Sequence, residues 1–336
     1  GVTGVQTCAL PIYTKYAIAV TNGTAALHLA LKLAGVAPGD EVLMPALTFV
    51  ATANAVTYCG AEPHFVDIEE STLGIDPNKL FEYLKSNSDL VTGKCKNKKT
   101  GKTISALVPM HTFGHPVRMD ELIEIAKEFN LAVVEDAAES LGSFYKSKHT
   151  GTMGKLGILS FNGNKIITTG GGGAILTNDA NLARKAKHLS TTAKINHPWE
   201  FKHDNIGFNY RMPNLNAALG CAQLEQLHLK LNAKRELHDK YVQAFAGLKE
   251  VKIFTETVDC KSNYWLITLI FNSDLNSELI ATLKCTNDAN IMTRPTWTPL
   301  NDLDIFKQFP NSDLSTSADI AKRVINLPSS PQLISI

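Results

Sequence analysis

Residues 160–173 read SFNGNKIITTGGGG, so that one lysine, Lys165, stands between an apolar segment and a run of four glycines. The apolar residues 157–161 predict a short buried strand, and residues 174–177 predict another. A lysine at the end of a strand in an apolar setting loses its proton easily, because burial disfavours the charged form. A neutral lysine amine can form a Schiff base with an aldehyde cofactor. Lys165 is therefore a candidate catalytic residue, although a solvated lysine beside a flexible glycine turn fits the same stretch.

Short apolar strands alternate with helices along the first two thirds of the chain. Strands are expected at residues 16–20, 41–44, 64–68, 104–110 and 131–136, and helices at 25–35, 48–59, 76–84, 119–129 and 178–190. This alternation predicts an α/β fold with a mostly parallel central sheet and helices on both faces. We expect residues 86–103 to form an inserted loop.

The last third of the chain has a different pattern. Residues 211–248 predict a long helical stretch that leads into a smaller C-terminal α+β domain. Strands are expected there at residues 251–254, 264–271 and 291–294, with a helix at 277–289. We therefore divide the chain into a large domain, residues 13–230, and a small domain, residues 231–336.

Several polar residues fall at the ends of predicted strands. Ligands of parallel sheets bind beyond the carboxyl ends of the strands, where Asn22, His111 and Asp136 lie. The turn at residues 21–24 begins a helix, and free N–H groups at a helix N-terminus attract anions. An ordinary helix start and, for Asp136, a helix cap are the structural alternatives. Phe49 either packs in the first turn of its helix or covers the face of a planar ring.

The composition excludes several classes of protein. The chain has 336 residues, of which 44% are hydrophobic, and a formal net charge of +1, which argues against nucleic-acid and membrane-surface partners. Its 6 cysteines are too scattered for a zinc site or a disulfide framework. We therefore expect no metal site and a location in the reducing cytoplasm. No apolar run is long enough to cross a membrane.

Residues 1–12, GVTGVQTCALPI, resemble a translated sequencing adapter and are treated as non-native. We expect a native N-terminal segment to be missing, which predicts an intact cofactor site but poor turnover.

Five motifs in order resemble the pyridoxal-phosphate-dependent sugar aminotransferases, the DegT/DnrJ/EryC1/StrS family within fold type I (aspartate aminotransferase-like). The motifs are NGTAAL at 22–27, PALTF at 45–49, EDAAESLG at 135–142, SFNGNK at 160–165 and NYRM at 209–212. The resemblance implies pyridoxal 5′-phosphate as cofactor. It also implies a homodimer with shared active sites, because the family passes the last motif into the neighbouring subunit's site.

The resemblance assigns roles to individual residues. The cofactor-binding residues that it implies are Gly23, Thr24, Ala25, Phe49, Asp136, Glu139, Ser160, Lys165 and Asn209. Asp136 would pair with the pyridine nitrogen, Phe49 would stack on the ring, and Glu139 would contact the ring hydroxyl. The phosphate would bind at Thr24 and Ala25, with help from Ser160 and from the neighbouring subunit's copy of Asn209.

Lys165 would bind the cofactor covalently and then act as the base that moves the proton. Candidates for binding the acidic donor or a diphosphate are His111, Arg211, Tyr264 and Arg294, for which surface ion pairing is the alternative.

A narrower resemblance concerns the substrate. Residues 149–152, 162–173 and 292–295 are similar to the subgroup that serves legionaminic acid and bacillosamine biosynthesis. That similarity implies transfer of an amino group from L-glutamate to C4 of a UDP- or GDP-linked 4-keto-2-acetamido-6-deoxy sugar. The alternatives are a deoxysugar dehydratase of the same family, against which the presence of Lys165 argues, and an inactive cofactor-binding homologue.

Overall fold

The computed structural model describes residues 14–272 and 276–334, so the prediction for residues 1–12 lies outside the described part of the chain. The central sheet has the spatial order β1 (Tyr16–Val20), β11 (Gly173–Thr177), β10 (Leu156–Ser160), β7 (Ala132–Asp136), β6 (Thr103–Leu107), β2 (Glu41–Pro45), β3 (Glu62–Val66). The strands from β10 to β3 are parallel to their neighbours, whereas β11 is antiparallel to both β10 and β1. The mostly parallel sheet that the alternation predicted is confirmed.

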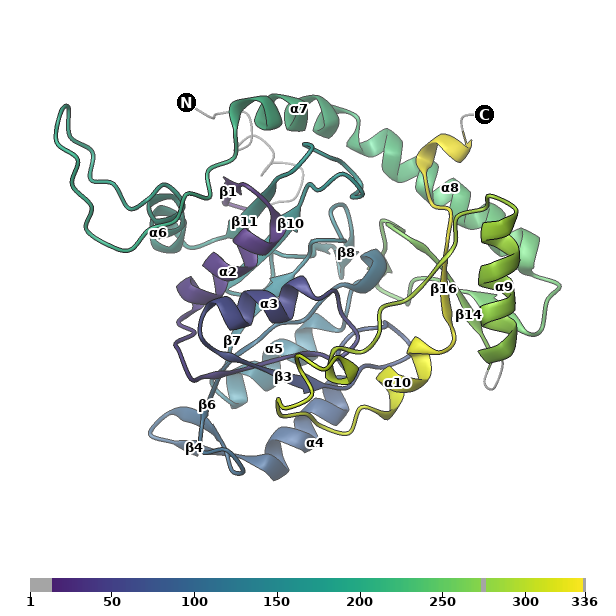
Figure 1. The fold of residues 1–336 in the computed structure, drawn as a ribbon, viewed down its shortest axis with the longest axis horizontal. Helices are drawn as coiled ribbons and strands as arrows, with labels where there is room; N and C mark the ends of the chain where they lie inside the picture. The colour runs from purple at the N-terminus through teal and green to yellow at the C-terminus, as the bar shows by residue number, and fades with distance from the viewer. Residues whose placement is uncertain (1–13, 273–275, 335–336) are drawn as a thin grey trace.

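Helices cover both faces of this sheet (Figure 1). On one face, an apolar cluster joins the sheet to α2 (Gly23–Ala34), α3 (Ala51–Tyr58) and α6 (Ala180–Ser190). On the other face, a second cluster joins it to α4 (Pro77–Asn87) and α5 (Met119–Glu128). Burial of apolar side chains on both faces explains why the strand sequences are nearly continuous in apolar residues.

Within residues 86–103, residues 88–97 form a hairpin, so the prediction of an inserted loop was wrong. β4 (Ser88–Val91) pairs with β5 (Lys94–Asn97), and β5 continues onto β6. The turn between them is Thr92-Gly93, with φ of 50° and 75°. A two-residue turn with positive φ matches the twist of antiparallel strands, so this pair was the available signal within a polar segment.

The predicted helical stretch at 211–248 is two helices, α7 (Asn214–Glu225) and α8 (Leu227–Phe245). Beyond α8, an antiparallel sheet has the order β12 (Val251–Ile253), β14 (Ile267–Phe271), β16 (Val324–Leu327), β15 (Arg294–Pro295). This sheet packs with α8 and α9 (Asn276–Asp288) around its own apolar core. Because the boundary at 230/231 falls inside α8, this helix belongs to both parts, and the division into 13–230 and 231–336 stays a proposal.

Short elements complete the chain: β8 (Phe144–Tyr145), β9 (Lys148–His149), β13 (Cys260–Lys261), α10 (Ser315–Ala321), and the 3-10 turns η1 (Thr112–Gly114), η2 (Leu300–Asp302) and η3 (Pro331–Ile334). The long loop between α6 and α7 projects away from the body of the protein (Figure 1). Its side chains Trp199, Phe201 and Ile206 are exposed. Among residues 14–272 and 276–334, no helix combines the length and apolar character needed to cross a bilayer.

Candidate active site

A cavity of about 300 Å³ lies beyond the carboxyl ends of the parallel strands. Its wall contains most of the predicted cofactor residues: Gly23, Thr24, Phe49, Asp136, Glu139, Ser160 and Lys165. These residues come from separate segments that the sheet topology brings to one edge. The position agrees with the rule that open α/β sheets bind ligands at this edge.

Lys165 lies at the wall of the cavity, and the exposed fraction of its side chain is 12%. Its Nζ is 3.2 Å from Glu139 Oε1 and 3.9 Å from the centroid of the Trp265 ring. The segment before it turns back on itself, because the Lys165 N–H donates to the carbonyl of Asn162 at 3.1 Å. The amine is therefore confined between a carboxylate and an aromatic face.

The carboxylate of Asp136 is buried at the end of β7. Its Oδ2 accepts a hydrogen bond from Thr52 Oγ1 at 2.7 Å, and its Oδ1 accepts from the Ala138 N–H at 3.1 Å. Burial raises the pKa of Asp136, and Lys165 and the two hydrogen bonds only partly counter this effect. A cationic group bound in the cavity would offset the cost of keeping this carboxylate charged.

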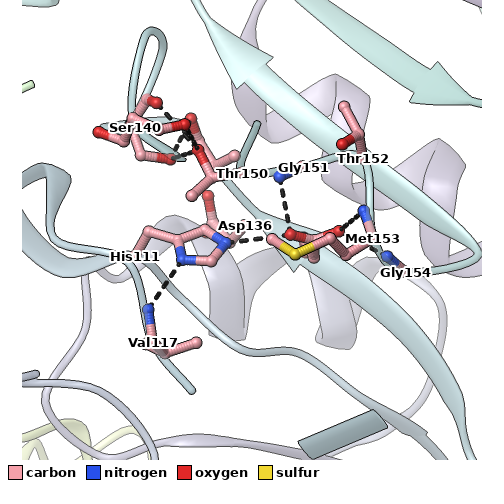
Figure 2. A network of polar contacts seen from close by, with 12 residues as sticks. His111, Val117, Asp136, Ser140, Thr150, Gly151, Thr152, Met153 and Gly154 are labelled. Atoms are coloured by element: carbon pink, nitrogen blue, oxygen red, sulfur yellow. Dashed lines mark hydrogen bonds and ion pairs between the residues drawn. The ribbon is translucent and has the colours of Figure 1, made fainter. Parts of the chain in front are cut away.

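Glu135, the preceding residue, points to the opposite side of β7, as the alternation of a strand requires. Its carboxylate accepts hydrogen bonds from the N–H groups of Gly151 at 2.7 Å and of Met153 and Gly154 at 2.6 Å. Figure 2 shows this network around His111, whose Nε2 is 3.1 Å from Glu135 Oε2. Glu135 thereby ties the loop before β10 to the strand that carries Asp136. This role of Glu135 was not predicted from the sequence, although the alternation of side chains along a strand indicates it.

His111 belongs to that network rather than to the cavity wall. It is fully buried, and its Nδ1 accepts a hydrogen bond from the Val117 N–H at 3.3 Å. Both ring nitrogens therefore have protein partners, which gives no support to the predicted contact between His111 and substrate.

The N-terminus of α2 forms one end of the cavity. The side chain of Asn22 accepts a hydrogen bond from the Ala25 N–H at 2.8 Å, so this N–H is taken by the helix cap and Ala25 does not line the cavity. The cavity is lined instead by Gly23 and Thr24, with Ser160 beside them. A Cβ atom on Gly23 would lie 2.9 Å from Ser160 Cβ, so only glycine allows this approach. The arrangement suits an anion at the helix N-terminus.

Aromatic side chains also line the cavity. Phe49 is 48% exposed, and its ring centroid lies 6.3 Å from that of Trp297. Trp297 also packs against Phe113 at 4.9 Å. Trp265 and Trp297 both line the cavity. Trp265 lies within the strand predicted at 264–271 and Trp297 follows the one predicted at 291–294, and no motif distinguished either from a core tryptophan.

Glu139 is a buried acid at the same wall. Its Oε2 accepts a hydrogen bond from the Phe113 N–H at 3.0 Å. Burial raises the pKa of Glu139 to about 7, with the positive charge of Lys165 acting in the opposite direction. The Glu139 carboxyl therefore carries a proton for part of the time near neutral pH, next to the Lys165 amine.

Besides His111 and Ala25, four further predicted residues do not line this cavity. Asn209 and Arg211 are exposed, and their backbones form isolated antiparallel bridges with Thr191 and Val20, respectively. Tyr264 is buried and stacks on His238, with ring centroids 3.8 Å apart. Arg294 is exposed in β15. Their roles remain predictions.

Comparisons with known proteins agree with this geometry. The model of the DegT/DnrJ/EryC1/StrS aminotransferase family matches residues 8–335. The chain is 38% identical to a GDP-perosamine synthase from Escherichia coli O157:H7 over 321 residues, which are 96% of this chain and 82% of the relative. It is also 38% identical to the putative pyridoxal phosphate-dependent aminotransferase EpsN of Bacillus subtilis, covering 94% of this chain and 79% of the relative. A DegT DnrJ EryC1 StrS aminotransferase from Brucella abortus has a similar structure, with a TM-score of 0.88 and 26% identity over 98% of this chain and 85% of the other.

The residues of the cavity fit pyridoxal phosphate. Gly23 leaves an anion-binding helix N-terminus open at one end, and Asp136 is a buried carboxylate that a cationic ring nitrogen would stabilise. Lys165 provides an amine in the same cavity. Together with the comparisons, this geometry shows that the chain belongs to the DegT/DnrJ/EryC1/StrS aminotransferase family and is a pyridoxal-phosphate-dependent sugar aminotransferase of nucleotide-sugar biosynthesis.

Proposed function

We propose that this protein transfers the amino group of L-glutamate to C4 of a nucleotide-linked 4-keto-6-deoxy sugar. The observation that supports this proposal most directly is the placement of the Lys165 amine and the buried Asp136 carboxylate in one cavity. A dehydratase that lacks the lysine could not use such a site, and an inactive binding protein would need neither group.

The residues that would bind the cofactor follow from the cavity. The N–H groups of Gly23 and Thr24 and the hydroxyl of Ser160 would bind the phosphate. Asp136 would face the pyridine nitrogen, Phe49 would cover the ring, and Lys165 would hold the cofactor covalently. When bound, pyridoxal phosphate supplies an electron sink for the bonds at the reacting carbon.

Proton transfer is assigned to Lys165. Its Nζ would remove the proton from Cα of glutamate in the first half-reaction and deliver a proton to C4 of the sugar in the second. Glu139, 3.2 Å away, would hold a proton for this amine near neutral pH. Trp265 and Trp297 would exclude water from the reacting atoms.

For the nucleotide, we propose GDP. The support is the 38% and 37% identity to relatives named GDP-perosamine synthase. The motifs at residues 149–152, 162–173 and 292–295 support instead a 2-acetamido sugar of the legionaminic acid or bacillosamine type, so this group at C2 is the second variable to test.

The test is a screen of purified protein with pyridoxal phosphate and L-glutamate. GDP- and UDP-linked 4-keto-6-deoxy sugars, each with a hydroxyl or an acetamido group at C2, are supplied, and the amino sugar is detected by mass spectrometry. We expect a GDP-linked amine that is absent with Lys165→Ala. Amination of UDP-linked sugars alone would overturn the choice of GDP, and amination by Lys165→Ala would overturn the role of the lysine.

We further propose a cytoplasmic homodimer with shared active sites. Asn209 and Arg211 are exposed where the loop between α6 and α7 returns to the body of the protein, and this exposure supports a contact with the neighbouring subunit. Mixing Lys165→Ala and Asn209→Ala chains tests the sharing, because hybrid dimers would contain one site with both residues intact. Activity of the refolded mixture above that of either variant alone is expected, and activity equal to the mean of the two variants would contradict it.

A further inference from the structure

The Lys165 amine lies over the face of the Trp265 ring. Lys165 Nζ lies 3.9 Å from the ring centroid, which is within the range of a cation–π interaction. The indole N–H donates to the carbonyl of Asn164 at 2.7 Å, so the same side chain also fixes the backbone next to the lysine. A lysine has a long, flexible side chain, and these two contacts restrict where its amine can lie.

The backbone of Trp265 is itself fixed from two sides. Its N–H donates to Asn263 Oδ1 at 2.8 Å, and Asn263 Nδ2 donates to the carbonyls of Glu139 at 2.8 Å and Leu141 at 2.9 Å. A Cβ atom on Gly114 would lie 1.9 Å from Asn263 Oδ1, so only a glycine at position 114 leaves room for the Asn263 side chain. Asn263 thus connects Trp265 to the segment that carries Glu139.

The second group that fixes the Trp265 backbone, after Asn263, is a buried lysine of α8 (Leu227–Phe245). Lys234 is 4% exposed, and its Nζ donates to the carbonyls of Tyr264 at 3.3 Å, Trp265 at 2.8 Å and Ser329 at 2.6 Å. Tyr264 has φ of 47°, a strained conformation for a bulky residue. A buried amine is costly, and a strained residue persists only where its surroundings over-determine it. The buried amine binds the carbonyl of Trp265, which contacts Lys165, and the strained Tyr264 directly precedes it.

We propose that Trp265 is a positioning residue for Lys165, and that Lys234 of the long helix α8 fixes Trp265 in that position. The proposal rests on the proposed role of Lys165 and makes the reaction depend on the smaller domain, which supplies the tryptophan. Without the ring, the amine loses one of the two groups between which it lies, Glu139 being the other.

Cofactor-free protein gives the first test. Its lysines are reductively methylated with ¹³C-formaldehyde, and the Lys165 signal is identified by its absence in Lys165→Arg. An aromatic face this close displaces the signal upfield of the other lysines. We expect Trp265→Leu and Lys234→Met to abolish the displacement and Trp265→Phe to retain part of it. The matched control is Phe81→Leu, which removes the ring 5.8 Å from Lys85 and leaves the Lys165 signal unchanged.

The loaded enzyme gives the second test. We expect Trp265→Leu to lower kcat about tenfold, as loss of a desolvated cation–π contact would, with KM for glutamate changed less than about twofold. Trp265→Phe should recover most of kcat. If Trp265→Leu fails to fold, as judged by its near-UV circular dichroism, the proposal is tested by Trp265→Phe and by the position of the wild-type Lys165 signal.

A wild-type Lys165 signal among those of the other lysines, or one that Trp265→Leu does not move, would overturn the proposal. Failure of the proposed function looks different, because Lys165 would then not be labelled by pyridoxal phosphate and borohydride in the wild type.

Discussion

Gly23→Ala is expected to weaken cofactor binding through a single contact. The added Cβ atom would lie 2.9 Å from Ser160 Cβ and 3.2 Å from Ser160 Oγ. Carbon atoms pack best at roughly 3.5–4.0 Å, so Ser160 or the start of α2 must move by about 0.6–1 Å. Such overpacking costs about 1–3 kcal/mol, and it displaces both the hydroxyl and the N–H groups that would bind the phosphate.

The assay is titration of cofactor-free protein with pyridoxal phosphate, followed by the fluorescence of Trp265 and Trp297 in the cavity wall. The displacement predicts a Kd raised by about tenfold to hundredfold for pyridoxal phosphate. Pyridoxal, which lacks the phosphate, should bind the variant and the wild type alike. Gly247→Ala is the matched control, since nothing lies within 4 Å of its added Cβ atom. An unchanged Kd for pyridoxal phosphate, or an equal loss for pyridoxal, would refute the assignment of this helix N-terminus to the phosphate.

Three further predictions concern buried charged groups. Burial raises the pKa of Glu139 to about 7 from an ordinary value of 4.5, so the folded state keeps a proton that the unfolded state releases, and stability falls as pH rises through that window. Glu139→Gln should remove up to about 3 kcal/mol of this decline in the free energy of unfolding. The measurement is urea unfolding of the cofactor-free protein at successive pH values. Parallel plots of unfolding free energy against pH for the variant and the wild type would disprove the prediction. Burial lowers the pKa of Lys234 to about 7 from 10.5, so the unfolded state holds the extra proton and stability rises with pH between these values. In guanidinium unfolding, the stability of Lys234→Met should not rise with pH in this range. If it rose as much as that of the wild type, the rise would come from other groups. Glu135→Gln should destabilise the protein by about 1–3 kcal/mol, because one amide oxygen cannot accept what two carboxylate oxygens accept from Gly151, Met153 and Gly154. Exposed Glu124→Gln is its control in thermal unfolding, and equal midpoints for the two variants would contradict the role of Glu135.

The sheet and the cofactor cavity could be predicted from the sequence because both depend on local signals. Apolar runs alternating with helices specify a parallel sheet, and strand ends specify the edge at which Asp136 and Lys165 meet. The hairpin at β4 and β5 was missed because its polar residues hide the Thr92-Gly93 turn.

The walls of the cavity were harder to predict, because position at a strand end does not say where a side chain points. His111 and Tyr264 were expected to meet ligands, and both are buried against other protein groups. Trp265 meets Lys165 across 100 residues of chain, and no periodicity identifies such a pair. The signals that were available lay in the alternation of Glu135 and Asp136 along one strand.

The central claim is that Lys165 is the residue that holds the cofactor. The most direct measurement is to add pyridoxal phosphate to the purified protein, reduce with borohydride, and map the labelled peptide by mass spectrometry. The account predicts a stoichiometric label on Lys165 that is lost in Lys165→Ala. A label on another lysine, such as the buried Lys234, or no label in a folded sample, would contradict it.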